Sequence, residues 1–285
     1  GQMLPSLFPA LRVAIDDDRQ TRGRFVVTGS SSPDLLESIS ESLAGRVAVI
    51  EMAPLSMPEA FALTPSPIAS ALGERWTLER LADELEAFVA GPRSGLPVKE
   101  IHRYWFRGGY PEPWVRGTDR FHRAWMESYG QTYLQRDVAR LFPGLNAEAF
   151  RVFLQLLAGL SGAIVNYADV ARTLSVSQPT ARQYFRIAHG TFLWRHVPAY
   201  TGSTTKRTVR HPRGYLRDSG LLHHLLRIAD LDALLSHPRL GASWEGWVIE
   251  QILRGLSARG VPCDASFYRT QGGAEVDLVL EGQFG

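Results

Sequence analysis

Two stretches near the end of the sequence, LGASWEGWVIEQIL (240–253) and FYRTQGGAEVDLVLEG (267–282), decide how the chain is interpreted. The first has apolar residues at helical spacing and predicts an amphipathic helix that carries Glu245. The second predicts a hairpin that turns at Gly272–Gly273 and places Asp277 inside an apolar strand. A carboxylate in apolar surroundings costs free energy unless something uses or pairs it. Both acids therefore need a function or a partner.

The composition is that of ordinary globular protein. The chain has 285 residues, of which 45% are hydrophobic and 21% are charged, and this length suggests two or three folded units. No apolar run approaches the ~20 residues that a membrane-spanning helix needs. A single cysteine, Cys263, excludes an internal disulfide framework and fits a reducing compartment. We therefore expect a cytoplasmic protein that does not contact a membrane.

The N-terminal part predicts a strand, a helix and a second strand. FVVTG (25–29) and VAVIEM (47–52) are short apolar runs rich in β-branched residues. The segment between them predicts a helix with its N-cap at Ser32 and its end at Gly45. Apolar strands joined by a helix are typical of a parallel sheet. Two strands cannot make a whole sheet, so we expect the other strands to lie outside this chain.

Three segments of this region, QMLPSLFPALRVAIDDDR (2–19), GRFVVTGSSSPDLL (23–36) and ESLAGRVAVIEMAPLS (41–56), carry a family resemblance. They resemble the second half of an AAA-type P-loop ATPase core. The family consists of predicted ATPases with a C-terminal domain of unknown function. The resemblance implies ATP and Mg as cofactors of the parent protein.

The same resemblance places Thr28 and Ser30 at the end of a sensor strand and Arg46 near the nucleotide. Turn and capping chemistry for Ser30, and a solvated helix end for Arg46, are the alternative interpretations. The sequence has no G-x-x-x-x-G-K-[ST] loop and no acid-tipped strand before Gln2. Nucleotide hydrolysis and a bound cofactor are therefore not expected for this chain alone.

After a helical block, residues 167–188 predict two short helices joined by the turn SVS. Ser177 is a suitable N-cap for the second helix. TFLWRHVPAY (191–200) and TVRHPRGYL (208–216) predict two strands that follow it. The pattern is that of a winged helix-turn-helix.

The charge of this region predicts duplex DNA as a partner. Nine cations and no acids lie between Asp169 and Asp218, so a net charge of +2 for the chain leaves −7 for the rest (+2 − 9 = −7). A one-sided basic patch is typical of phosphate binding. The predicted DNA-binding residues are Gln178, Thr180, Arg182, Gln183, Arg186, Lys206, Arg207, Arg210 and Arg213. Alternatively, this basic face docks on an acidic protein partner or domain and serves an interaction or regulatory role.

The helix acid Glu245 and the strand acid Asp277 together resemble the PD-(D/E)xK nuclease fold. The resemblance implies that they are a catalytic pair and that Asp277 binds a divalent metal. That family completes its site with a Glu-x-Lys on the next strand, which this sequence lacks. Metal-dependent nuclease activity is therefore an expectation only for the intact parent protein.

These observations predict a multidomain chain of mixed α/β and α structure. We expect part of a P-loop ATPase core with the edge of a parallel sheet at 1–70 and a helical block at 71–146. A winged helix-turn-helix follows at 147–230, and an incomplete nuclease-like α/β module at 231–285. The predicted function is that of an ATPase fragment that binds DNA through the winged helix.

Overall fold

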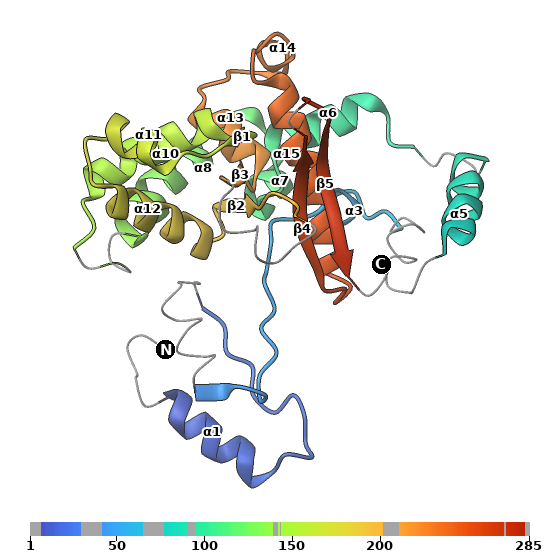
Figure 1. Ribbon diagram of the computed structural model, residues 1–285, viewed down its shortest axis with the longest axis vertical. Coiled ribbons are helices and arrows are strands. Elements are labelled where there is room, and N and C mark those ends of the chain that lie inside the picture. Colours follow the sequence, from blue (N-terminus) through green and yellow to red (C-terminus); the bar gives the residue numbers. More distant parts are fainter. Residues whose placement is uncertain are drawn as a thin grey trace.

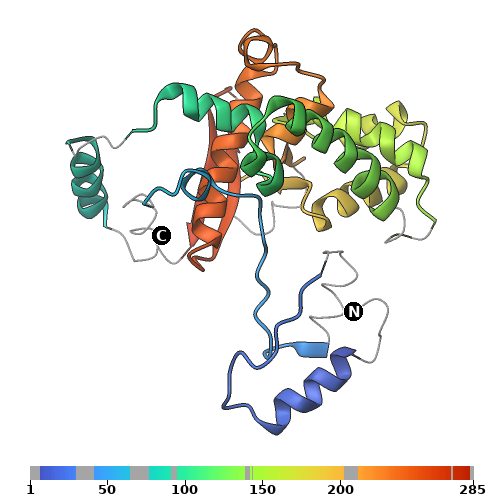
Figure 2. The same ribbon diagram turned by 180° about the vertical axis from the view of Figure 1, so that it is seen from behind.

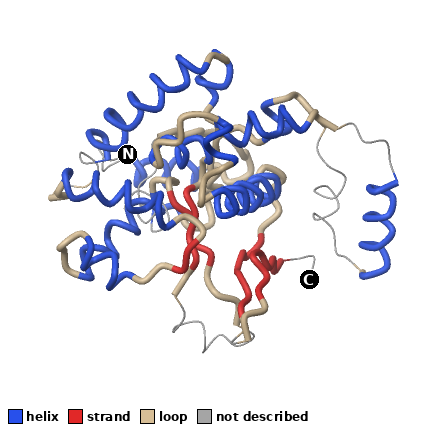
Figure 3. The backbone as a smooth tube through the Cα atoms, turned by 90° about the horizontal axis from the view of Figure 1, so that it is seen from above, coloured by secondary structure: helices blue, strands red, loops and turns tan. Residues whose placement is uncertain are grey.

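The computed structural model describes residues 7–29, 42–64, 77–90, 95–138, 142, 144–201, 211–270 and 272–282. It is a mixed α/β arrangement in which helices predominate (Figure 1). The described strands form two small antiparallel sheets, which Figure 3 shows as two separate groups of strands. Within the described part of the chain, no helix is both long and apolar enough to cross a membrane.

The N-terminal part contains α1 (Leu7–Asp17) and α3 (Met57–Ala60). Figures 1 and 2 show α1 apart from the main body, joined to it by an extended segment. The predicted parallel sheet is wrong in the described residues, because neither 25–29 nor 47–52 forms a strand. Neither segment pairs with a strand of the described residues, and Ile50 is 84% exposed. The helix expected between them lies mostly outside the described residues.

The extended segment is attached to the main body near α3. The Leu55 amide donates to the Gly109 carbonyl over 2.8 Å, and the Met57 amide donates to Oε1 of Gln251 over 2.8 Å. The Trp114 indole donates to the Ala60 carbonyl over 3.0 Å. These bonds fix the chain where it enters the folded body.

A block of helices follows α3 along the chain. Its members are α5 (Leu78–Ala90), α6 (Val98–Arg107), α7 (Pro111–Arg116), α8 (Asp119–Tyr129) and the π-helix η1 (Gly130–Asp137). Aromatic residues recur every four positions along α8 and η1, and their rings stack on one another. The Trp125 and Tyr129 rings lie 5.1 Å apart, and those of Tyr129 and Tyr133 lie 5.2 Å apart.

The next unit consists of three helices and a three-stranded sheet. Its elements are α10 (Ala147–Leu160), β1 (Ala163–Ile164), α11 (Tyr167–Thr173), α12 (Gln178–Gly190), β2 (Trp194–Val197) and β3 (Arg213–Leu216). The strand order is β1-β3-β2, with both pairs antiparallel. Phe150, Phe153 and Leu157 of α10 are buried with Phe185 of α12 in one core. This core holds α12 in place.

The C-terminal unit consists of α13 (Ser219–Leu225), α14 (Leu231–Leu235), α15 (Leu240–Ser257), β4 (Cys263–Arg269) and β5 (Glu275–Gly282). The helix around Glu245 and the hairpin around Gly272–Gly273 form as predicted. The hairpin also joins the preceding unit, because the Tyr200 amide donates to the Phe267 carbonyl and the Phe267 amide donates to the Pro198 carbonyl.

A second hydrophobic core lies between these two units. Val197 and Tyr215 of the three-stranded sheet are buried against Ile249 and Leu253 of α15 and Phe267 of β4. This core spans the boundary that we predicted between residues 230 and 231. The sheet beside α12 and the C-terminal hairpin are therefore packed on each other.

Asp218 explains why a glycine pair precedes α7. Its buried carboxylate accepts from the Leu221 amide at the start of α13 over 2.9 Å and from the Gly109 amide over 2.8 Å. Gly108 has a φ of 74°, and a Cβ there would collide with the same carboxylate. Only glycine fits this position, since it tolerates both the left-handed backbone and the close approach.

Candidate nucleic-acid interface

The second helix of the predicted pair, α12, has two distinct faces. Its N-cap is Ser177, as predicted, whose hydroxyl accepts from the Thr180 amide over 3.2 Å. Ala181 and Phe185 are buried in the core. The predicted DNA-binding residues of this helix lie on the other side, and Arg182 and the residues that share its face are exposed. The exposed members are Gln178, Arg182, Gln183 and Arg186.

Thr180 is half-buried and takes part in the cap, since its hydroxyl lies 2.8 Å from that of Ser177. The predicted wing residues Lys206, Arg207 and Arg210 lie outside the described residues.

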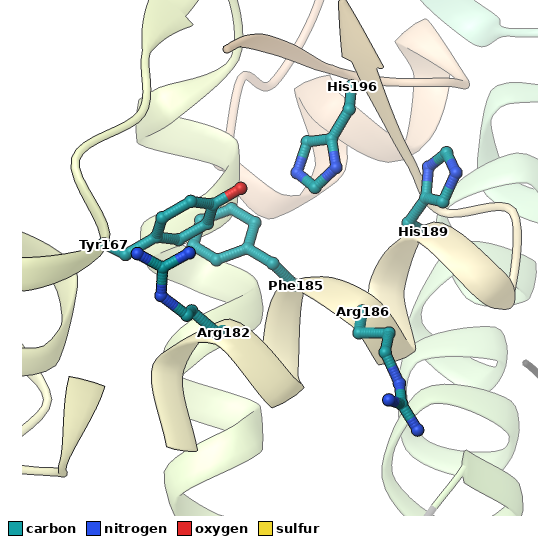
Figure 4. Close-up of a pocket in the computed structure, with 6 residues that line it drawn as sticks. All are labelled: Tyr167, Arg182, Phe185, Arg186, His189 and His196. Atoms are coloured by element: carbon teal, nitrogen blue, oxygen red, sulfur yellow. The ribbon is translucent and has the colours of Figure 1, made fainter. Parts of the chain in front are cut away.

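A shallow cavity of about 260 Å³ opens beside the exposed face of α12. Its lining comes from α11, α12 and β2 and comprises Tyr167, Arg182, Phe185, Arg186, His189 and His196. The Arg182 guanidinium lies over the Tyr167 ring, 4.7 Å from its centre. Figure 4 shows that Arg186 points away from the other side chains of the cavity. The two arginines are thus presented in different directions on one surface.

The two histidines of this cavity are neutral near pH 7. Their rings stack 5.3 Å apart, and the His189 Nδ1 lies 3.1 Å from the Trp194 carbonyl. Burial lowers the pKa of His196 to about 4, and it also lowers the pKa of His189. The positive charge of this face therefore comes from the arginines.

Arg213 differs from the exposed residues of α12, because it is only 6% exposed. Its guanidinium faces the two acids that the sequence singled out. Nη1 lies 3.1 Å from Oε1 of Glu245 and 2.9 Å from Oδ1 of Asp277, and Nη2 forms an ion pair with Glu275. We call these four residues the Arg213 cluster. With its charge engaged inside the protein, Arg213 is not part of the exposed basic face.

The geometry of the Arg213 cluster also shows whether Glu245 and Asp277 are arranged to bind a metal ion. The structure brings the two carboxylates together, but a cation of the protein itself lies between them. Glu245 in addition accepts a hydrogen bond from the Tyr215 hydroxyl. Burial and this bond raise the pKa of Tyr215, which keeps the phenol protonated. The carboxylates as arranged here do not fit a divalent metal, since the metal would have to displace a buried guanidinium.

A second charge cluster on α15 escaped the sequence analysis. Glu250 is 2% exposed and is surrounded by three arginines, which we call together the Glu250 cluster. Arg195 binds both of its carboxylate oxygens, Nε of Arg217 lies 3.3 Å from Oε2, and Nε of Arg254 lies 3.4 Å from the same oxygen. Arg217 also forms an ion pair with Glu51.

The arginines decide the charge state of Glu250. Burial alone would raise its pKa, but the attraction of Arg195 and Arg217 and the hydrogen bond from Arg195 lower the pKa to about 2. The carboxylate is therefore ionised at neutral pH. Among the nine cations between Asp169 and Asp218, at least four (Arg172, Arg195, Arg213 and Arg217) form ion pairs with acids of the chain itself.

The structure describes two of the three nucleotide-binding residues that the ATPase resemblance implies, Thr28 and Arg46. Thr28 is exposed in the extended segment, and Ser30 lies outside the described residues. Arg46 binds Asp16 through two hydrogen bonds of 2.8 and 3.0 Å. Hydrogen bonds from Arg46 and Arg19 lower the pKa of Asp16 to about 2. A nucleotide phosphate would therefore compete with Asp16 for Arg46.

Comparison with protein families supports the resemblance in outline. Residues 2–61 match the model of an AAA domain, and residues 98–232 and 240–284 match two domains of unknown function, DUF8612 and DUF4143. The first of these matches relates residues 2–61 to AAA domains.

Two curated proteins are similar to this chain to the same extent. They are uncharacterized proteins of Mycobacterium tuberculosis (Rv2008c) and Mycobacterium bovis (Mb2031c), each 35% identical over 286 aligned residues. The alignment covers 99% of this chain and 54% of each relative, so the chain spans about half of their length. No solved structure matches.

Proposed function

We propose that this chain binds duplex DNA through the exposed face of α12. The proposal rests on the two faces of this helix. One face is apolar and buried in the core, and the other is exposed and carries Arg182, Gln183 and Arg186. In helix-turn-helix proteins the second helix enters the major groove. Arginine and glutamine are side chains that contact guanine and adenine edges, and arginine also binds phosphates.

The surrounding strands support the interpretation of this unit as a winged helix. β3 lies between β1 and β2 in the sheet, and β2 and β3 are consecutive antiparallel strands directly after α12. The connection between them contains Lys206, Arg207 and Arg210 in the sequence. In a winged helix this connection lies beside the recognition helix and adds phosphate contacts, so we include these three residues in the proposed interface.

We further propose that the chain belongs to a longer protein whose ATPase region, with ATP and Mg as its cofactors, acts on this DNA contact. The AAA match at residues 2–61 supports this, as does the attachment of residues 51–61 to the main body. In this proposal Thr28, Ser30 and Arg46 belong to the nucleotide side. Hydrolysis by this chain alone is not proposed, since its sequence has no phosphate-binding loop.

The experiment is a titration of a fluorescent random-sequence duplex at several salt concentrations. We compare the wild type with Arg182→Glu/Arg186→Glu and with the control Arg120→Glu/Arg123→Glu, which makes the same charge change on exposed positions of α8. We expect affinity to fall steeply with salt and to drop about tenfold or more in the α12 variant only. Circular dichroism of each variant checks that the helices are retained.

Two results would overturn the proposal. Equal losses in the two variants would mean that only net charge matters, and no binding by the wild type at low salt would exclude duplex DNA as a partner. Saturable capture of an acidic protein that DNA does not compete away would instead favour docking of the basic face on a protein.

A further inference from the structure

The Arg213 cluster gathers residues from three elements around one guanidinium. Arg213 begins β3, Glu245 lies on α15, and Glu275 and Asp277 lie on β5. The two oxygens that approach Nη1, from Glu245 and Asp277, are at most 6.0 Å apart (3.1 + 2.9 = 6.0). Carboxylate oxygens bind a hard divalent cation at about 2.3–2.6 Å, so opposite ligands lie roughly 5 Å apart. As they stand, no group of acids among the described residues is arranged to hold a metal ion, and the centre between Glu245 and Asp277 is occupied by Nη1 instead.

The charges do not balance within the cluster. One arginine and three carboxylates sum to −2 (+1 − 3 = −2), and Arg269 reaches Glu275 only at 3.9 Å. The guanidinium is buried on its other side, where it lies over the Phe267 ring, 5.0 Å from the ring centre. Without Arg213 the three acids would repel one another, because like charges at this distance disfavour ionisation.

We propose that Arg213 is the built-in cation of this cluster and fills the position in which the three carboxylates would otherwise hold a divalent metal ion. A planar guanidinium binds several carboxylates at once through its fixed donors, and unlike a metal ion it cannot leave. The cluster therefore ties β3, and with it the base of the proposed wing, to α15 and β5 at any metal concentration. This inference does not depend on DNA binding.

The test uses Mn²⁺ as the probe and compares the wild type with Arg213→Gln, which removes the charge and keeps a polar side chain. Mn²⁺ binding is measured by isothermal titration calorimetry and by the electron paramagnetic resonance signal of free Mn²⁺. We expect Arg213→Gln to bind one Mn²⁺ roughly tenfold or more tightly than the wild type. We also expect Mn²⁺ to raise the melting temperature of Arg213→Gln and to leave that of the wild type unchanged.

Two further variants make the result specific to this cluster. Arg213→Gln/Asp277→Asn has one carboxylate fewer, so the gained Mn²⁺ affinity should be lost. Arg213→Lys keeps a positive charge and should remain insensitive to Mn²⁺. If Arg213→Gln does not fold in metal-free buffer, recovery of its helical signal by Mn²⁺ supports the proposal.

Three outcomes overturn the proposal. The first is saturable Mn²⁺ binding by the wild type that Asp277→Asn abolishes, because the metal then binds beside Arg213. The second is a folded Arg213→Gln protein that gains no affinity for Mn²⁺. The third is an unfolded Arg213→Gln protein that Mn²⁺ does not restore.

Discussion

The Glu250 cluster and the Arg213 cluster are inverse arrangements on the same helix. In the first, one carboxylate is surrounded by three arginines, and in the second, one guanidinium is surrounded by three carboxylates. The first is enclosed, since the central carboxylate and two of its arginines are buried. The second opens to water, because the Asp277 side chain is 53% exposed.

The comparison shows that access to water decides how much stability is lost when one charged partner is removed. A buried charge depends wholly on its protein partners, whereas a partly hydrated charge loses less when a partner is removed. The Glu250 cluster joins β2, the residue after β3 and α15, so we expect it to stabilise the fold. The Arg213 cluster joins β3, α15 and β5, so we expect it to position the hairpin.

The largest effect is expected for Glu250→Gln. The substitution leaves the charges of Arg195, Arg217 and Arg254 close together without their carboxylate, and the free energy of unfolding should fall by about 3–5 kcal/mol. Urea denaturation followed by tryptophan fluorescence measures it. Glu79→Gln, the same change at an exposed position of α5, is the control and should have almost no effect. Equal stability of the two variants would contradict the comparison.

The loss of unfolding free energy caused by Glu250→Gln should become smaller in acid. The pKa of Glu250 is about 2 in the folded protein, below the ordinary value of 4.5. A lowered folded pKa contributes stability that is fully present above the unfolded pKa and is lost as the pH falls towards the folded one. The difference in unfolding free energy between wild type and Glu250→Gln should therefore be constant above pH 4.5 and shrink between pH 4.5 and 2. A difference that does not change over this range would contradict the ionised state of Glu250.

A smaller effect is expected for Arg213→Gln. The three acids that lose their cation can hydrate, so the loss of unfolding free energy should be about 1–3 kcal/mol in metal-free buffer. Urea denaturation of this variant and of Glu250→Gln under the same conditions gives the ranking directly. If Arg213→Gln were the more damaging of the two, solvent access would not be what distinguishes the clusters.

The sequence predicted what depends on local pattern. The two faces of α12, its cap at Ser177 and the hairpin at Gly272–Gly273 follow from periodicity and turn chemistry, and all three are in the structure. The positions of Glu245 and Asp277 in apolar elements indicated that both needed a partner, and they meet at one guanidinium.

What the sequence could not predict depends on contacts between distant segments. The arginines around Glu250 come from β2, from the residue after β3 and from α15, and only Arg254, four residues along the same helix, is visible as a local pair. Counting nine cations could not separate Arg213 and Arg217, which are buried, from Arg182, which is exposed. Likewise, the apolar runs at 25–29 and 47–52 are not strands, and among the residues that the structure describes no strand pairs with them to complete their hydrogen bonds.

Glu51→Gln probes the outer edge of the Glu250 cluster. Glu51 pairs with Arg217, but its side chain is 31% exposed, so its removal should lower the free energy of unfolding by about 1 kcal/mol or less. Limited proteolysis of the segment before α3 offers a second measurement, since loss of this ion pair should speed cleavage there. An unchanged rate of cleavage would mean that the hydrogen bonds of the Leu55 and Met57 amides are sufficient to hold the segment in place.

The smallest effect is expected for Asp277→Asn, and its sign distinguishes the two clusters most sharply. The Arg213 cluster has an excess of negative charge, so removing one carboxylate relieves repulsion between the remaining acids while Arg213 keeps Glu245 and Glu275. We expect a change within about 0.5 kcal/mol in either direction, whereas any loss of charge at Glu250 destabilises. A double-mutant cycle with Arg213→Gln isolates the coupling between Asp277 and Arg213. A loss above about 2 kcal/mol for Asp277→Asn alone would show that its exposed carboxylate is as dependent on the arginine as the buried Glu250 is on its three.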